Sequence, residues 1–525
     1  MMFPNNHSQD GVERPLLADL SETNYEATTS EASGDAGNHG AFKRNLGAVE
    51  AFGIVISIVI GSGVFTSPGS IDANVPSPGT ALVVWLIGGI LAWTGATTMA
   101  ELGTSIPGEG GVQPYLQYIF GDIFGFLAAW TWIIAVMPAT LAILSIVFIE
   151  SIYSVTGVTD QAGAIHHKLL SILVLVAISV ANSISTKVST RLSSFFVTTK
   201  FITITAIVLA GLVVVIIHLS SSSWEGPAKD WYSRSWFGVR NTVTPDGGEI
   251  HWRDLGGWEI LGHYSTALYG ALWAYSGWDK AVYVTSELSA PASQLPLAIN
   301  MAVPIVILCF VAANTAYYIL LPWSVVSTTD SVAVTAITHL LGAGAGIVAA
   351  GLICLVVAGS LLGNSFVAGR MVVAAANQNW LPRFLGILGH LGVSSQASTQ
   401  PNSIDGQASE SDAPINATIL STVLPIIYIL FGNFRALVTF NGLGEYSFFF
   451  LTVLGAILLR FKEPDRCRPY KPIIVIPVIF ALVSGFVVIR GAIFAPPQAV
   501  ILILLWVLGV VYIQIRKRWT RGRTA

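Results

Sequence analysis

The sequence predicts an all-α integral membrane protein with twelve transmembrane helices. Hydrophobic residues make up 53% of its 525 residues, charged residues make up 10%, and the mean hydropathy is +0.68. Soluble domains of this length do not reach this balance. Apolar runs of about 20 residues, which is the length that crosses a bilayer, recur between clusters of Gly, Pro and charge. The three cysteines lie in unlike surroundings and predict no disulfide framework.

The chain begins with a polar stretch, residues 1–42, which has no apolar period and predicts a disordered cytosolic tail. It lacks the basic start and apolar core of a secretory signal. Glu13–Leu17 resembles an acidic dileucine sorting signal, although an unstructured tail offers such strings by chance. Lys43 and Arg44 precede the first apolar segment, so the positive-inside rule predicts a cytosolic N-terminus.

The membrane domain is predicted to cover residues 43–516, and a basic cytosolic tail, residues 517–525, follows it. With both termini in the cytosol, the basic clusters between segments fall on the cytosolic side. The long loop 219–261 is then external, and loop 387–413 is a flexible cytosolic loop. The twelve apolar segments are residues 46–71, 80–103, 122–150, 169–186, 195–218, 262–286, 294–323, 334–372, 414–432, 436–460, 472–492 and 495–515.

The first segment contains a stretch, Ile58–Pro68, that is predicted to interrupt its helix. Gly61 and Gly63 flank Ser62, so the backbone unwinds there at little cost. Within hydrocarbon, the freed N–H and C=O groups must face protein, water or a ligand. The stretch is therefore a candidate binding site.

A second interruption, Trp273–Asp279, lies in the sixth segment, at the position that corresponds to the first segment in the other half of the chain. Two such breaks in register are typical of a secondary transporter with its site near the bilayer midplane. The glycines of either interruption alone would favour close helix packing. Amides at Ser62, Gly63 and Val64 suit a carboxylate, and carbonyls around Trp273–Tyr275 suit an ammonium. An α-amino acid carries both groups.

Several motifs in order resemble the amino acid–polyamine–organocation superfamily and, within it, the L-type amino-acid transporter family; we expect a fungal member. The resemblance covers residues 43–516. The motifs are Gly61–Phe65 in the first helix, Ala100–Gly103 at the end of the second, Gly110–Tyr115 before the third, Ala274–Trp278 in the sixth with Leu295–Ile299 after it, and Arg468–Pro472 before the eleventh.

The resemblance implies a LeuT-like fold with a five-plus-five inverted repeat and discontinuous helices 1 and 6. It places the substrate carboxylate near Ser62 and Gly63, the amino group on carbonyls of Val59 and Trp273–Tyr275, and an aromatic gate at Trp273. Packing or interfacial anchoring is the alternative for Trp273, one of 15 tryptophans. The substrate-binding residues implied are Val59, Gly61, Ser62, Gly63, Val64, Trp273, Ala274, Tyr275, Ser276 and Asp279.

Lys200 matches the position in the fifth helix where sodium-independent family members carry a lysine. By that resemblance its ammonium substitutes for a sodium ion, and it donates to carbonyls of the unwound first helix and to Ser360 of the eighth. The alternative is that Lys200 snorkels to the cytosol. An ionisable group within a membrane segment is a functional hypothesis by default.

Asp279 departs from the family, which usually has an uncharged amide at this position. It would attract a cationic side chain, accept a proton, or pair with Lys280 or Lys200, and the sequence does not rank these roles. Near predicted cytosolic helix ends, Glu101, Glu287 and Arg370 are candidates for an inner gate, although ordinary helix-end charges are the favoured interpretation.

Partners and cofactors are predicted mainly from what the sequence lacks. Loop 154–168 has no cysteine where many animal members form a disulfide to a single-span glycoprotein, so we expect no disulfide-linked heavy subunit and a monomer or homo-oligomer. No metal-ligand cluster or nucleophile motif is present, and His166–His167 has no third ligand nearby in sequence. We therefore predict no enzyme, no cofactor and no metal.

These observations predict an amino-acid transporter that works by alternating access. The favoured form is sodium-independent exchange of neutral L-amino acids, large neutral or of broad range, in the plasma membrane. A vacuolar or endosomal membrane is also consistent with the sequence. One alternative is a proton-coupled symporter that titrates Asp279 or Glu101. An alternative of another class is an amino-acid-sensing receptor that does not transport.

Overall fold

The computed structural model describes most of the chain between Phe52 and Thr524. The predicted tail 1–42 and all but the first residue of the predicted loop 387–413 lie outside the described residues. The described residues are 52–53, 56, 59–106, 111–156, 164–184, 186–220, 231–244, 247–279, 288–387 and 415–524.

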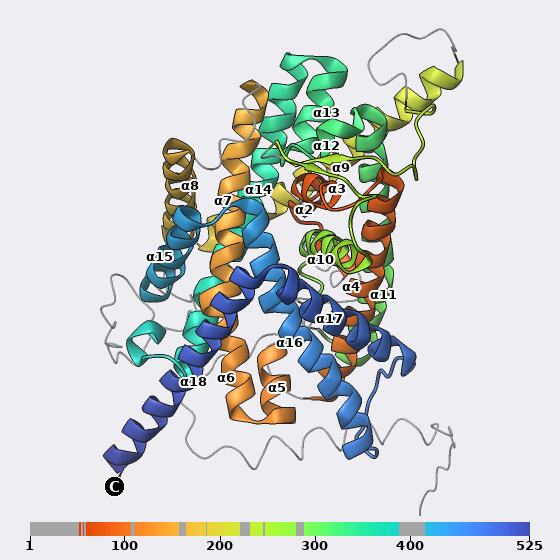
Figure 1. Ribbon diagram of the computed structural model, residues 1–525. Coiled ribbons are helices and arrows are strands. Elements are labelled where there is room, and N and C mark those ends of the chain that lie inside the picture. The colour runs from red at the N-terminus through yellow and green to blue at the C-terminus, as the bar shows by residue number, and fades with distance from the viewer. Residues whose placement is uncertain are drawn as a thin grey trace, which may run out of the picture. The chain divides into compact units, whose positions relative to one another are not determined.

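The described residues form an all-α bundle with one short hairpin, as the sequence predicts (Figure 1). The elements are α2 (Gly63–Thr66), α3 (Pro68–Asp72), α4 (Pro78–Ser105), α5 (Val112–Phe120), α6 (Asp122–Thr131), η1 (Trp132–Val136), α7 (Met137–Tyr153), η2 (Ser154–Thr156), α8 (Ile165–Ile184), α9 (Thr186–Ser220), β1 (Thr242–Val243), β2 (Glu249–Ile250), α10 (Gly257–Ala274), α11 (Pro291–Leu320), α12 (Trp323–Val326), α13 (Val332–Leu341), α14 (Ala343–Asn377), η4 (Arg383–Gly386), α15 (Ile415–Phe431), α16 (Phe434–Lys462), α17 (Val475–Phe494) and α18 (Pro496–Thr524).

Nine spans in the described part of the chain are long and apolar enough to cross a membrane, with α6, η1 and α7 counted as one. Helix α15 is apolar but has only 17 residues, and the first predicted segment is described only in part. The count of twelve spans and the inverted repeat therefore stay predictions. The predicted segment 334–372 is divided in the structure, since Gly342 separates α13 from α14.

The third span contains a turn of π-helix, η1, which has an identifiable cause. Pro138 has no N–H to donate to the carbonyl of Ile134 four residues earlier. The hydroxyl of Tyr428, on α15, donates to that carbonyl at 2.8 Å. A side chain from a distant helix thus satisfies the backbone group that the proline leaves open.

The backbone leaves the helical pattern at both predicted interruptions, and the two stretches pack directly against each other. Residues 60–62 are non-helical before α2, and α10 ends at Ala274. Figure 1 shows α2 and α3 beside α10, and the packing contacts agree. A Cβ atom at Gly63 would overlap the Cα of Ala274 and would lie 2.9 Å from its Cβ. Only glycine allows this approach.

Long helices surround the two interruptions. Helix α4 packs against α10, α11 and α17, while α16 packs against α10 and α17. On another side, α7 packs against α14, α8 and α15, and α9 packs against α11 and α14. The buried core of these helices includes Trp85, Tyr275, Phe310 and Tyr317. The broken backbone is therefore covered by protein, as a bilayer requires.

The predicted external loop folds back onto α3 through an ion pair with a buried carboxylate. Arg240 Nη2 lies 2.5 Å from Oδ2 of Asp72, whose other oxygen accepts a bond from the Tyr318 hydroxyl at 2.8 Å. Arg240 also donates to the carbonyl of Trp323 at 2.8 Å. The Thr242 hydroxyl, which donates to the Val75 carbonyl at 3.1 Å, adds a second attachment. We call residues 231–244 and 247–256 the loop cap.

A second buried charge cluster joins the C-terminal parts of α4 and α16. Glu101 accepts a bond from Nε of Arg460 at 2.9 Å, and a second one from its Nη2. Nε of Arg468 lies 3.4 Å from the same carboxylate. All three side chains are buried. Nearby, at the surface, a hydrogen bond from Arg466 lowers the pKa of the Glu463 carboxyl.

The contact at Gly63 generates a prediction for stability. Gly63→Ala should lower the free energy of unfolding by about 1 to 3 kcal/mol, because the added methyl group must displace backbone atoms. Thermal unfolding of the purified protein in detergent measures the change. Gly351→Ala is the matched control, because a Cβ at Gly351 meets no atom within 4 Å. Equal unfolding midpoints for the two variants would show that Gly63 is not in close contact with Ala274.

The cluster at Glu101 generates a second prediction. Glu101→Gln should lower the free energy of unfolding by about 3 to 5 kcal/mol, because two arginines lose a buried counter-charge. The same unfolding assay applies. Glu249→Gln is the control, since this half-exposed carboxylate lies 3.9 Å from His251 and its loss should not move the midpoint. A stable Glu101→Gln protein would show that the cluster contributes little.

Candidate functional site

The first interruption is a tight, buried turn of the backbone. Val59 and Val64 are fully buried, and Ser62 is nearly so. The amide of Gly61 donates to the Val59 carbonyl at 2.8 Å, in a tight turn that replaces the helical pattern. Helix α2 then begins at Gly63, and the first N–H groups of a helix have no partner within it.

The second interruption is a turn that follows Ala274 at the end of α10. The amide of Ser276 donates to the Trp273 carbonyl at 3.1 Å, and Gly277 has a φ of +109°. That conformation is strained for any residue with a side chain. The glycine after Ser276 is therefore what lets the chain leave the helix axis here.

Trp273, the predicted gate, lies at the last turn of α10 and is only 7% exposed. Its ring meets that of Phe434 edge to face, with centroids 6.1 Å apart and planes at 90°. Phe434 is the first residue of α16. The tryptophan thus links the second interruption to the start of α16.

The Tyr275 side chain points into the helical core rather than toward a ligand. Its ring packs on Phe310 at 4.9 Å and against Trp85 at 6.0 Å, between α4 and α11. Its hydroxyl has no hydrogen-bond partner among the described residues. The atoms of Tyr275 that remain for substrate binding are those of its main chain.

A buried carboxylate that we did not predict lies at the second interruption. The Ser276 hydroxyl donates to Oε1 of Glu445 on α16 at 3.3 Å. Asp279 is 1% exposed in the same turn, so two buried acidic side chains belong to this region. The sequence signal for Glu445 was present, because an acidic residue within an apolar segment is a functional hypothesis in itself.

Lys200 and Ser360 lie on helices that pack together. Phe196, one turn before Lys200 on α9, packs against Gly359, which precedes Ser360 on α14. Lys200 is only 7% exposed. The Ser360 hydroxyl is buried and has no hydrogen-bond partner within the described ranges.

The structure describes two of the three candidates for an inner gate, and these two lie in different surroundings. Glu101 binds Arg460 and Arg468, so it is more than an ordinary helix-end charge. Arg370 is exposed, and its guanidinium lies 3.8 Å from the centroid of the Phe366 ring. Glu287 lies outside the described residues.

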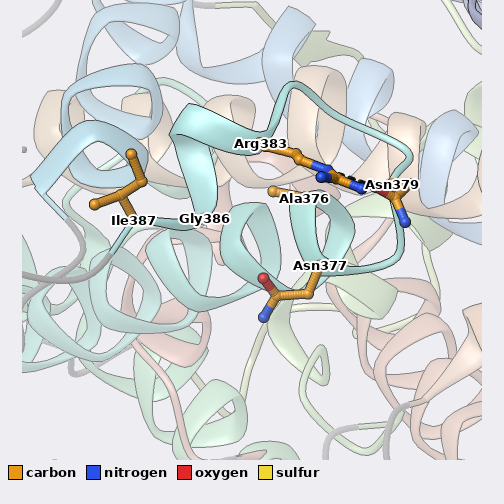
Figure 2. Close-up of a pocket in the computed structure, with 6 residues that line it drawn as sticks. All are labelled: Ala376, Asn377, Asn379, Arg383, Gly386 and Ile387. Carbon is orange, nitrogen blue, oxygen red and sulfur yellow. Dashed lines mark hydrogen bonds between the residues drawn. The ribbon is translucent and has the colours of Figure 1, made fainter. Parts of the chain in front are cut away.

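A hollow of about 290 Å³ lies at the C-terminal end of α14 (Figure 2), and none of its lining residues belongs to the two interruptions. It is lined by Asn377, Asn379 and Arg383 among others. It is therefore distinct from the predicted substrate site. Among the described residues, no group of three or more His, Cys, Asp or Glu side chains is placed to hold a metal ion.

Comparison with known proteins identifies the family. Residues 46–515 match the family described as amino acid permease. The b(0,+)-type amino acid transporter 1 of Mus musculus is 29% identical over 469 residues, which are 89% of this chain and 87% of the relative. The large neutral amino acids transporter small subunit 2 of Mus musculus is 28% identical over 463 residues, 88% of this chain and 79% of the relative. These mammalian relatives do not test the expectation of a fungal source. The chain belongs to the amino acid permease family of the amino acid–polyamine–organocation superfamily, and it is a multi-pass membrane transporter of amino acids rather than an enzyme.

Proposed function

We propose that this transporter binds its substrate between the two interruptions and carries it by alternating access, as sodium-independent exchange of neutral L-amino acids. The observation that carries the proposal is the direct packing of the first interruption, at Gly63, on the second, at Ala274. This packing supports the proposal because discontinuous helices that meet bring non-helical backbone from distant parts of a transporter chain to one place.

The binding mode follows from the chemistry of that backbone. Amides at Ser62, Gly63 and Val64 take the substrate carboxylate, and carbonyls of Val59 and Trp273 take the ammonium. Main-chain groups recognise the part that all α-amino acids share. The surrounding residues then select among substrates by the substrate side chain. One of these residues, Asp279, is charged.

Trp273 acts in this proposal as the gate, and Phe434 supports it through the edge-to-face contact. Lys200 takes the place of a bound sodium ion. Its burial favours this role over snorkelling, because a snorkelling ammonium would reach solvent. Ser360, with a buried hydroxyl on the adjoining helix, is the proposed acceptor.

For the substrate class, we propose neutral amino acids, large neutral or of broad range, because the name of one relative refers to large neutral amino acids. The absence of cysteine from residues 154–168 supports function without a disulfide-linked heavy subunit, as a monomer or homo-oligomer. We place the protein in the plasma membrane with both termini in the cytosol, and the vacuolar and endosomal membranes are the alternatives.

Transport into proteoliposomes tests the proposal. Labelled neutral amino acids should enter only vesicles preloaded with amino acid, with or without sodium. Trp273→Ala should reduce this exchange roughly tenfold, since an edge-to-face aromatic contact contributes up to about 1.5 kcal/mol. Phe431→Ala, at a residue that is 87% exposed, is the control and should exchange normally. Uptake that needs sodium would contradict sodium independence. Uptake into empty vesicles would contradict exchange.

Proton-coupled symport is a second candidate, and the burial of Glu445 and Asp279 beside the second interruption favours it. It predicts uptake into empty vesicles that increases with an inward proton gradient. Glu445→Gln should then abolish the increase while it keeps exchange between equal pools, because the amide oxygen still accepts the Ser276 bond. Asp465→Asn, at an exposed acidic residue, should change neither activity. Uptake that ignores the gradient rejects this candidate.

A further inference from the structure

The end of α14 carries two adjoining hollows that share Asn379, which we together call the basic hollow. Figure 2 shows the first of them. The second has a volume of about 270 Å³ and lies between the turn after α14, the α5–α6 corner and α18. The lining residues are Ala376, Asn377, Asn379, Arg383, Gly386 and Ile387 in the first, and Gln117, Asp122, Gln378, Asn379, Trp380, Ile513, Arg516 and Lys517 in the second.

The backbone turn at the centre of the basic hollow is held by arginines. Asn379 has a φ of +57°, and its side-chain oxygen accepts a bond from Nε of Arg383 at 3.2 Å. Arg516, on α18, donates to the carbonyls of Asn379 and Leu381, each at 2.7 Å. The turn is therefore fastened to α18, and the hollow is built by contacts between distant segments.

The charge of the basic hollow is positive. Arg383, Arg516 and Lys517 line it, and Asp122 is the one acidic residue in its described lining. Lys517 Nζ lies 3.7 Å from Asp122, whose other carboxylate oxygen accepts a bond from Gln117 at 3.1 Å. The side chains of Arg383 and Lys517 remain open to solvent, so two cations can reach a ligand.

The surroundings of the basic hollow have the composition of a membrane–water interface. Tyr512 stacks on Trp130 at 5.4 Å and on Phe126 at 6.1 Å, and Trp380 meets Phe126 edge to face. Aromatic side chains of this kind gather at the level of the lipid headgroups. Phe384, the neighbour of Arg383 in the sequence, is 57% exposed. An apolar surface thus adjoins the cations.

We propose that the basic hollow binds the headgroup phosphate of an anionic phospholipid, with the acyl chains along the exposed apolar face of α18. Arginine and lysine pair with phosphate oxygens, and basic pockets between helices on the cytosolic side recognise anionic headgroups. The basic C-terminal end of α18 predicts that this end of the bundle is cytosolic, where anionic lipids are enriched. The site is independent of the proposed exchange mechanism.

Binding to the full-length protein in detergent tests the site. Native mass spectrometry should count one tightly held dioctanoyl phosphatidylglycerol, bound in preference to dioctanoyl phosphatidylcholine. The double variant Arg383→Gln and Lys517→Gln should bind this lipid about tenfold more weakly than the unchanged protein does, because each cation near the headgroup contributes to affinity. Arg383→Lys with Lys517→Arg keeps both charges and should restore binding.

Three outcomes would overturn the proposal. The matched control, Lys462→Gln with Lys471→Gln, removes two exposed lysines elsewhere in the chain; an equal loss of binding there would show an unspecific charge effect. No preference for the anionic lipid would exclude headgroup recognition. Inorganic phosphate that displaces the lipid at equal concentration would show an ion site instead. The unfolding midpoint in phosphatidylcholine checks that each variant is folded, so weakened binding is assigned to the site.

Discussion

The contact of Gly63 with Ala274 is the constraint on which the rest of the structure depends. Two helices that are interrupted within a bilayer expose backbone groups that lipid cannot satisfy. They are tolerable only if they cover each other and if long helices cover both. Helices α4, α11 and α16 provide that cover, and the rings of Trp85 and Phe310 pack against Tyr275 in the second interruption.

Two charge clusters, each built on a buried carboxylate, join segments that are far apart in the sequence. Asp72, at the end of α3, is held by Arg240 of the loop cap, and Glu101, in α4, is held by Arg460 and Arg468. Buried ion pairs add little net stability but strongly penalise the loss of one partner. Such pairs therefore specify which segments lie together, and each ties one segment to a particular neighbour that is distant in the sequence.

The sequence predicts the fold class and both interruptions because those features have local signatures. Apolar length identifies the spans, and the Gly-Ser-Gly stretch at Gly61 and the turn at Gly277 identify the breaks. The partners of these elements were not predicted, because their contacts join distant segments. The sequence around Pro138 does not predict that the Tyr428 hydroxyl donates to the Ile134 carbonyl. The sequence around Ser276 likewise does not predict its hydrogen bond to Glu445. The division of one predicted segment at Gly342 was also missed, because apolar composition continues across it.

The pairing of Asp72 with Arg240 has a consequence for biosynthesis. The two residues are 168 positions apart, and four spans, from α4 to α9, are made between them. Until Arg240 has been synthesised and has reached the same side of the bilayer, Asp72 lacks the counter-charge that its buried position requires. The end of the first predicted span therefore gains its counter-charge only after the loop cap has been made, and nascent chains that stop before Arg240 hold Asp72 without this ion-pair partner.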